Sequence, residues 1–444
     1  MMAPHSRRKF IASTALSALA YSRVLGAADN LRLAAVGVGG QGWSDLSSVA
    51  ASPRVDVTAL CDIDESRNHL GRASEKFPSA RRFSDWRRLF DESKSFDAVI
   101  VATPDHMHAP VGLAALSLGK HVYCEKPLTH TVFEARQMAL AARKYNCVTQ
   151  MGNQIQSHSF YRTAVKLVHR GLVGKIQEVH SWQAGRLVWM LVDQRPEGGD
   201  PVPPEVNWNL WLGAAPERPY KQRLYHPFNW RAWQDFSNGQ LGDFGCHILD
   251  PVFSALKLTA PRTIRASDVK LPQDLWMKRC KVAYTFPGTD LTANRTIDVT
   301  WYDGDGHYPA LEKLGLPAGF ALPGSGSVLV GDKGSLLIPH VGMPRLFLRD
   351  GGEAKMGKED IVPGINHYTG WADACRGEGK TFSSFAYSGP LSETVLLGTL
   401  ASRFPEATLT WDSEAMKLTG QDQADSFLRK TYRKGWEPAW LSRP

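Results

Sequence analysis

The sequence predicts an α/β Rossmann domain with a doubly wound parallel sheet, followed by an α+β domain with an open, largely antiparallel sheet. Short apolar runs alternate with helical stretches from Leu31 onward, which is typical of a parallel sheet flanked by helices. Beyond about Asn153, several runs instead alternate apolar with polar residues, which indicates antiparallel strands. With 444 residues, the chain is also too long for a single compact core.

The first domain is expected to contain six strands. The apolar runs cover residues 31–36, 55–61, 81–83, 98–102, 121–124 and 147–151, and the run at 81–83 is the weakest. Six strands within roughly 120 residues are the number that a complete Rossmann sheet needs. We therefore place the dinucleotide-binding domain at residues 29–152.

The second domain is placed at residues 153–444 and includes the C-terminal helices. A helix is expected at 160–170, and strands are expected at 176–182, 282–286, 295–301 and 327–330. Two further helices at 368–376 and 391–404 would pack on this domain or return to the first. Because an open sheet can pair with a second copy, we expect a homo-oligomer.

The N-terminus reads as a targeting segment. Arg7 and Arg8 stand before an apolar run, residues 11–20, which is too short to cross a bilayer as a helix. This pattern resembles a twin-arginine signal, and small residues at 26–28 offer a cleavage region. We predict a signal peptide at residues 1–28 and an exported, periplasmic protein, the alternative being a disordered basic tail.

Charge and composition exclude several classes of partner. Of the net charge of +8, four positive charges precede the first acid, Asp29, so +4 remains after the predicted cleavage. No basic run suits a phosphate backbone, and no later stretch suits a membrane span, so we expect neither nucleic acid binding nor stable membrane insertion. The six cysteines lack Cys-x-x-Cys spacing, and Cys61, Cys124 and Cys147 are expected to fill the core.

A glycine-rich motif follows the first strand and opens a helical stretch. Gly37, Gly39 and Gly42 satisfy G-x-G-x-x-G, with Gln41 inside the motif. The first glycine permits a tight turn, the second lets the backbone approach a pyrophosphate, and the third allows close helix packing. The helix N-terminus then offers amide donors to the phosphates. The sequence therefore predicts a dinucleotide site.

The nucleotide preference depends on Asp62, which ends the second strand about 20 residues after the motif. Its carboxylate can accept hydrogen bonds from both ribose hydroxyls and would repel a 2′-phosphate, which favours NAD. Arg67 lies nearby and could hold a 2′-phosphate, so NADP stays open.

The nicotinamide of a dinucleotide lies near the carboxyl ends of the later strands. The loops after the expected strands at 98–102, 121–124 and 147–151 therefore supply candidate cofactor contacts, which are Thr103, Pro104, His108, Glu125, Lys126 and Asn153. His106 and His108 also suggest a metal pair, but no acid or cysteine accompanies them at metalloprotease spacing. We expect no metal.

Four segments together resemble one oxidoreductase family. They are Gly37–Gly42, Ala102-Thr103-Pro104, Glu125-Lys126-Pro127 and Gly242–Asp250. The combination is similar to the glucose-fructose oxidoreductase, inositol dehydrogenase and MocA family, from about residue 30 into the C-terminal helices. The resemblance implies a Rossmann domain, an open-sheet domain and activity on sugars or cyclitols with NAD or NADP. It also implies Lys126 as the active-site lysine, Asp243 as the active-site aspartate and His247 as the catalytic histidine.

The chemistry of these residue types agrees with the resemblance. Oxidising a hydroxyl carbon needs a base for the O–H proton, and histidine titrates in the right range for that work. Asp243 and His247 are four residues apart, so they lie on one helical face. Lys126 can donate to the developing alkoxide.

An aromatic stretch, residues 208–233, leads into the Asp243 motif. Aromatic faces suit sugar rings, and we single out Tyr225 and His226, together with Gln154, as candidate substrate contacts. Packing in the core is the alternative for any one of these aromatic residues.

Three functions follow from this sequence. The first is an NAD(P)-dependent oxidoreductase that takes hydride from a sugar, glycoside or cyclitol and restores a tightly held cofactor within each cycle, since an exported enzyme is separated from cytoplasmic NAD. The second is an NAD-dependent glycoside hydrolase or lyase that works through a keto-sugar. The third is a non-catalytic sugar-binding protein with structural NAD, which the complete set of Lys126, Asp243 and His247 disfavours.

Overall fold

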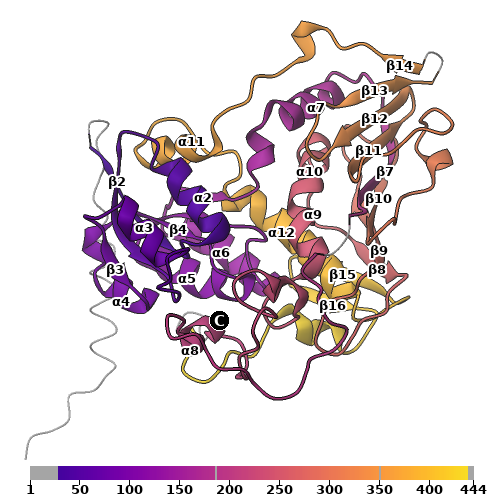
Figure 1. Cartoon of the computed structure of the whole chain (residues 1–444). Coiled ribbons are helices and arrows are strands. Elements are labelled where there is room, and N and C mark those ends of the chain that lie inside the picture. Colours follow the sequence, from indigo (N-terminus) through magenta and orange to yellow (C-terminus); the bar gives the residue numbers. More distant parts are fainter. Residues whose placement is uncertain (1–28, 186–187, 350–351, 439–444) are drawn as a thin grey trace, which may run out of the picture.

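The computed structural model describes residues 29–185, 188–349 and 352–438, and the predicted signal peptide at residues 1–28 lies outside this part. Two sheets organise the molecule, one in the N-terminal third and one in the remainder (Figure 1). The first is parallel and the second is mixed and mostly antiparallel, so the fold class expected from the sequence is confirmed.

The first sheet has the strand order β3-β2-β1-β4-β5-β6, and all its described pairs are parallel. Its strands are β1 (Leu31–Val36), β2 (Val55–Cys61), β3 (Arg81–Phe83), β4 (Ala98–Val101), β5 (His121–Cys124) and β6 (Thr149–Met151). Its helices are α2 (Gly40–Val49), α3 (Leu70–Lys76), α4 (Trp86–Asp91), η1 (Ser93–Ser95), α5 (Asp105–Ser117) and α6 (Val132–Lys144). The strand order reverses between β1 and β4, which is where such sheets bind ligands at their carboxyl ends.

The second sheet has the order β14-β13-β12-β11-β7-β10-β9-β8-β15-β16. Its strands are β7 (Ile176–Gln183), β8 (Thr263–Ser267), β9 (Cys280–Pro287), β10 (Thr296–Asp303), β11 (Ser325–Gly331), β12 (Gly334–Pro339), β13 (Arg345–Leu348), β14 (Gly352–Ala354), β15 (Thr408–Asp412) and β16 (Lys417–Thr419). β7 and β10 pair in parallel, and the other described pairs are antiparallel.

Besides its sheet, the second domain contains several helices. They are α7 (Ser159–His169), α8 (Trp208–Leu212), α9 (Gly239–Ile248), α10 (Asp250–Leu256), α11 (His367–Cys375) and α12 (Phe385–Ala401), with short turns η2 (Gln154–Ser157), η3 (Asn229–Ala232), η4 (Leu311–Lys313), η5 (Lys358–Asp360) and η6 (Ala424–Leu428). Of these helices, α9 and α12 lie between the two sheets (Figure 1). α12 packs against α6 of the first domain and α9 of the second, and α11 packs against α2. Both C-terminal helices therefore contact the first domain.

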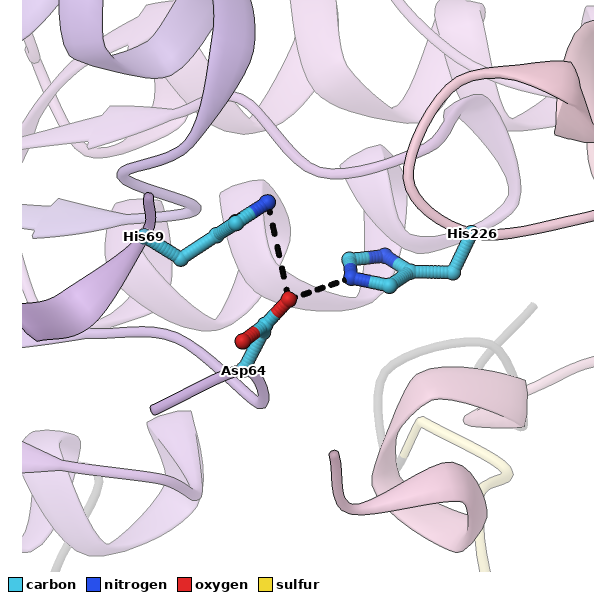
Figure 2. Close-up of side chains that lie close together, drawn as sticks. All are labelled: Asp64, His69 and His226. Atoms are coloured by element: carbon cyan, nitrogen blue, oxygen red, sulfur yellow. Dashed lines mark hydrogen bonds and ion pairs between the residues drawn. The ribbon is translucent and has the colours of Figure 1, made fainter. Parts of the chain in front are cut away.

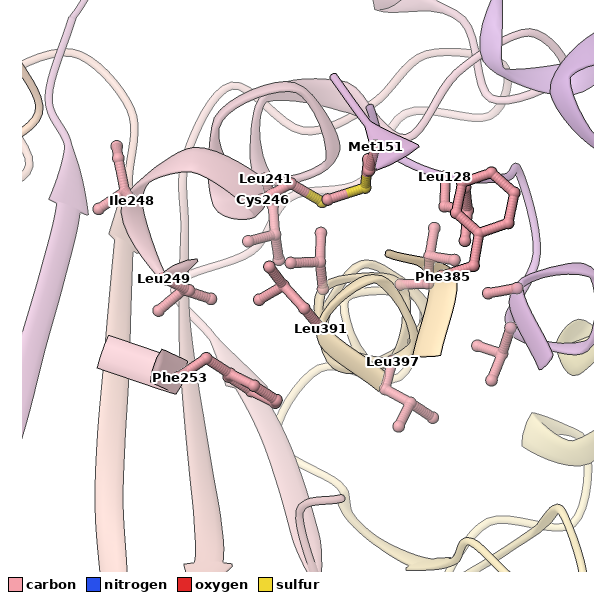
Figure 3. Close-up of a cluster of buried hydrophobic side chains, with 14 of the residues drawn as sticks. Leu128, Met151, Leu241, Cys246, Ile248, Leu249, Phe253, Phe385, Leu391 and Leu397 are labelled. Carbon is pink, nitrogen blue, oxygen red and sulfur yellow. The ribbon is translucent and has the colours of Figure 1, made fainter. Parts of the chain in front are cut away.

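A buried apolar cluster fixes α9 against the first domain (Figure 3). Leu128 and Met151, which follow β5 and end β6, meet Leu241 and Cys246 of α9 and Leu391 of α12, and all five are fully buried. Fully burying one such side chain contributes about 1.5–3 kcal/mol. This packing holds one face of α9 in place, so the polar residues on its other face have a fixed position.

Cys61 and Cys124 are buried within strands of the first sheet, and Cys147 is half-buried. Among the described residues, no helix combines the length and the apolar character needed to cross a bilayer.

Candidate active site

A cavity of about 630 Å³ opens at the carboxyl ends of the first sheet and is lined by both domains. Its walls include the loops after β1, β2, β4 and β5, the aromatic segment before α9, and α9 itself. Most of the candidate residues chosen from the sequence line it, namely Gly37, Gly39, Gln41, Asp62, Thr103, Pro104, His108, Glu125, Lys126, Gln154, His226 and His247.

The glycine loop has the shape that a dinucleotide requires. Gly37 has a φ of +83°, and a Cβ on it would lie 2.5 Å from the carbonyl oxygen of Ala102. A Cβ on Gly42 would lie 2.1 Å from the carbonyl oxygen of Gly37, so the third glycine permits close helix packing. Gly39 is the N-cap residue of α2 and has no side chain to cap the helix, which leaves first-turn amides for an anionic ligand. The loop therefore fits a pyrophosphate.

The Asp62 carboxylate is fixed beside this loop. It is 7% exposed and accepts hydrogen bonds from the backbone N–H of Val38 at 2.8 Å and of Asp64 at 3.0 Å. A carboxylate has about four acceptor sites, so capacity remains for ribose hydroxyls. Arg67, the sequence candidate for a 2′-phosphate, is 88% exposed and lies 3.7 Å from Glu75.

A buried ion pair joins the loop after β5 to α9 beside the cavity. Lys126 Nζ donates to Asp243 Oδ1 at 2.5 Å, and Arg231 Nε lies 3.5 Å from the same oxygen. Burial by itself raises the pKa of Asp243, but the positive charges of Lys126 and Arg231 outweigh it and hold that pKa well below its ordinary value. Burial lowers the pKa of Lys126, yet the carboxylates of Asp243 and Glu125 produce a net rise. Lys126 and Asp243 are therefore both ionised.

His247 follows Asp243 by one turn of α9. Within the described part of the chain, its Nδ1 is buried and has no hydrogen-bond partner, and its ring centroid lies 5.3 Å from that of His340. Burial, and then the charges of Lys126 and His340, lower the pKa of His247 well below 6.5. The imidazole is therefore neutral at pH 7 and can accept a proton.

His108 connects the loops that follow β4 and β5. Its Nε2 lies 2.7 Å from the carbonyl oxygen of Thr103, and its Nδ1 lies 2.8 Å from that of Pro127. Burial lowers the pKa of His108 to about 4, so the ring is neutral. Gln154 likewise donates to Glu125 at 3.0 Å, which orients the carboxyl group next to Lys126.

Three candidates have side chains that are engaged elsewhere or meet the site indirectly. Asn153 is 1% exposed, donates to Asp250 at 3.1 Å and accepts from Ser383 at 2.5 Å. Tyr225 is 1% exposed and packs within an aromatic cluster, with its ring centroid 4.9 Å from that of Trp233. Asp243 does not line the cavity itself but accepts a hydrogen bond from Lys126, which does. The contacts of Asn153 and Tyr225 are those of packing residues, and their roles toward ligands stay predictions.

The cavity also contains charged residues that were not singled out from the sequence, and two of them, Arg231 and Asp105, interact electrostatically with the Lys126 ion pair. Arg231, in η3, extends the charge network of Asp243 and belongs to the aromatic stretch that leads into α9. Asp105 begins α5, is 3% exposed and accepts from the backbone N–H of Asn238 at 3.1 Å. Burial raises the pKa of Asp105 to about 7, against the lowering effect of Arg231. Asp105 directly follows Pro104, so its position in the loop after β4 is the feature of the sequence that could have indicated a place in the site.

Two family models match consecutive parts of the chain. Residues 31–153 match a model described as an oxidoreductase family with an NAD-binding Rossmann fold, and residues 160–287 match the C-terminal alpha/beta domain of the same family. Together the matches cover more than half of the 444 residues. The chain belongs to the Gfo/Idh/MocA oxidoreductase family. Its first domain is thus an NAD-binding Rossmann domain, in agreement with the cofactor expected from Asp62.

Curated members of the Gfo/Idh/MocA family match part of this chain. A levoglucosan dehydrogenase from Pseudarthrobacter phenanthrenivorans is 30% identical over 155 residues, which are 33% of this chain and 39% of the relative. An alpha-N-acetylgalactosaminidase from Shewanella oneidensis is 25% identical over 168 residues, which are 36% of each chain. The chain therefore spans well under half the length of these two relatives.

Solved structures of low sequence identity share the Gfo/Idh/MocA fold over almost their whole length. The WlbA dehydrogenase from Bordetella pertussis, in complex with NADH and UDP-GlcNAcA, has a TM-score of 0.61 at 15% identity, covering 86% of this chain and 99% of that chain. A levoglucosan dehydrogenase in complex with NADH and levoglucosan has a TM-score of 0.60 at 17% identity, with the same coverage. An oxidoreductase domain protein from Kribbella flavida has a TM-score of 0.60 at 19% identity, covering 84% and 97%.

Proposed function

We propose that this chain is an NAD-dependent oxidoreductase that removes hydride from the hydroxyl carbon of a sugar, glycoside or cyclitol. The observation that carries the proposal is the Lys126–Asp243 ion pair with neutral His247, on the wall of the cavity that also contains the glycine loop. This set combines a fixed cation, a proton acceptor and a dinucleotide cradle. One relative is named levoglucosan dehydrogenase, and levoglucosan is a sugar derivative, which supports the proposed substrate class.

The chain's own residues account for the parts of this reaction that a protein supplies. Gly37, the start of α2 and Asp62 would hold the pyrophosphate and a ribose, while Thr103 and Glu125 would border the nicotinamide. The nicotinamide, when bound, supplies the hydride acceptor. His247 accepts the hydroxyl proton, since it is neutral and faces the cavity. Lys126, held in place by Asp243, donates a hydrogen bond to the same oxygen as negative charge develops there.

Retention of the cofactor through each cycle is the second part of the proposal. A segment of the second domain covers the loop after β2: Glu65 donates from its backbone N–H to Glu205 at 2.9 Å, and Asn207 donates to Ile63 at 2.9 Å. His226 adds a side-chain contact of 2.7 Å with Asp64. These contacts hold the second domain against the loop after β2, which contains the carboxylate expected to bind the ribose. They support slow release of NAD. Export of the folded protein through the twin-arginine pathway is part of the same proposal.

A second candidate function is supported by the relatives. An alpha-N-acetylgalactosaminidase and several family 109 glycosyl hydrolases match about a third of this chain at 25–32% identity. Oxidation of a ring carbon acidifies the neighbouring C–H, so the same site could eliminate a glycosidic group, add water and return the hydride. In that case the NAD is reduced and then reoxidised within one cycle, so there is no net consumption of NAD. Such a cycle is compatible with a retained cofactor.

The experiment that tests the proposal starts from protein isolated without added nucleotide. Denatured samples are analysed for NAD and NADP by mass spectrometry, and the native protein is incubated with sugars, cyclitols and aryl glycosides. We expect about one NAD per chain and a keto or lactone product that depends on a second carbonyl acceptor. Free aglycone without any acceptor supports the glycosidase instead. Protein that carries no nucleotide and forms stoichiometric NADH only with excess added NAD contradicts the retention.

A further inference from the structure

Three side chains outside the Lys126 site converge where the two domains meet. Asp64 follows β2, His69 directly precedes α3, and His226 belongs to the aromatic segment of the second domain (Figure 2). His226 Nε2 lies 2.7 Å from Asp64 Oδ2, and His69 Nε2 lies 3.5 Å from the same oxygen. One ligating atom from each residue lies within 4.8 Å of the other two.

We propose that Asp64, His69 and His226 bind one divalent transition-metal ion, for which zinc is the probe. Two imidazoles and one carboxylate are a ligand set that suits zinc and iron(II). Ligands at about 2.1 Å from such an ion lie roughly 3.0–3.5 Å apart. The separations of 2.7 and 3.5 Å from the Asp64 oxygen are close to this, and all three ligating atoms lie within 4.8 Å of one another. Rotation of the two imidazoles toward each other would complete the site.

The neighbouring groups orient the proposed ligands. His69 Nδ1 lies 3.4 Å from Asp62 Oδ2, so a proton on Nδ1 faces a carboxylate and leaves the Nε2 lone pair toward Asp64. A ligating histidine typically has its other ring nitrogen held by a carboxylate in this way. Asp64 Oδ1 accepts from the backbone N–H of Ser66 at 2.8 Å, which leaves Oδ2 for the ion. Tyr225, buried next to His226, anchors the third ligand.

Burial and charge also favour a cation here. The side chains of Asp64, His69 and His226 are 8%, 13% and 10% exposed. The carboxylates of Asp62 and Asp64 thus lie together in a largely desolvated site, and buried charges need a partner of opposite sign or a metal. One divalent ion balances the charges of the two carboxylates. Three protein ligands leave at least one coordination position for water.

The position of the site gives the ion a structural role. It would connect the loop after β2 to the aromatic segment of the second domain, beside the carboxylate expected to bind the cofactor ribose. His69 and His226 both line the cavity, so the ion would lie at its edge. This inference is independent of the proposed oxidoreductase activity, because metal binding is measured without substrate.

The test uses the full-length protein, stripped with a chelator and titrated with zinc sulfate by isothermal calorimetry. We expect saturable binding of one zinc per chain, and a thermal midpoint that rises with zinc concentration. Asp64→Asn, His69→Gln and His226→Gln should each weaken binding by at least about 100-fold. Asp62→Asn should weaken it about 10–100-fold, the usual effect of losing a group that orients a ligand.

His158→Gln is the matched control, because His158 is an exposed histidine at the start of α7 and should bind zinc as the unchanged protein does. Cobalt(II) provides a readout that needs no substitution: the unchanged protein should show visible d–d absorption that zinc abolishes. Absence of saturable zinc binding, or binding that Asp64→Asn and His226→Gln leave unchanged, overturns the proposal. The cluster is then a metal-free contact between the domains.

Discussion

Replacing Lys126 by Met removes the cation nearest to a buried carboxylate. Of the ion-pair partners of Asp243 in the described part of the chain, Arg231 then remains, with its Nε 3.5 Å from Oδ1. Removing one partner of a buried ion pair costs about 3–5 kcal/mol of unfolding free energy. Protonation of Asp243 limits this cost, because neutralising an ordinary aspartate at pH 7 takes about 4 kcal/mol. With Arg231 still present, we expect Lys126→Met to lower the unfolding free energy by about 3 kcal/mol at pH 7.

The pH dependence follows from the sign of the shift. In the unchanged protein the pKa of Asp243 is lowered, so its ion pair stabilises the fold above the unfolded pKa and loses that effect as pH falls through the folded pKa. In Lys126→Met, burial places the folded pKa above the unfolded value, so the penalty is full at high pH. At pH 5, protonating an aspartate with an unfolded pKa of about 3.9 takes about 1.5 kcal/mol. The loss of unfolding free energy in Lys126→Met is therefore limited to about this value near pH 5.

Urea unfolding followed by tryptophan fluorescence at pH 7 and pH 5 measures both effects. The double variant Lys126→Met/Asp243→Asn is the control, since removing both charges should recover most of the loss at pH 7. Lys126→Arg keeps the charge and should keep most of the stability. A loss below about 1 kcal/mol at pH 7, or an equal loss at both pH values, refutes the account of a charged and buried pair.

Three further predictions concern the cavity. His247→Ala should abolish turnover while NAD stays bound, and in the unchanged protein the acid limb of kcat/KM should lie below pH 6.5, because burial lowers the pKa of this base; an acid limb above pH 7 would contradict its role. Gly37→Ala should abolish NAD retention and lower the thermal midpoint, since its Cβ would lie 2.5 Å from a backbone oxygen at a φ of +83°; Gly306→Ala, with a φ of +65° and no atom within 4 Å of its Cβ, controls for the backbone strain. Asp62→Ala should lower the NAD content of the isolated protein while Arg67→Ala, at an exposed position, should not; equal effects would remove the ribose assignment.

The first domain could be predicted closely because its strands are buried on both faces. Continuous apolar runs then mark the strands directly, and β1, β2, β3 and β5 have the expected bounds. The strands of the second sheet could be predicted only in part from the sequence. β12 is almost wholly buried although it follows β11 after a two-residue turn, and the short edge strands β14 and β16 carry few apolar residues. Each of these strands pairs with the strand directly before or after it in the chain. They are hard to predict because β12 lacks the alternation of apolar and polar residues, and because β14 and β16 have only three residues each.

The candidate site was predictable where a motif follows a strand. The positions of Gly37, Asp62 and Lys126 depend on local pattern, and each lines the cavity. Side chains whose partners come from distant segments were not predictable: Asn153 is held by residues almost 100 and 230 positions away, and His226 meets Asp64 across 162 positions. Spacing along the chain carries no information about such contacts.

The transfer of hydrogen from a sugar carbon to the bound cofactor is the most direct measurement of the central claim. The isolated protein is mixed with fully C-deuterated sugars and methyl glycosides, quenched within one turnover, and its nucleotide is analysed by mass spectrometry. We predict reduced NAD carrying one deuterium, and none in His247→Ala. A nucleotide that remains unlabelled during product formation, or protein without NAD that still forms product, would contradict hydride transfer at this site.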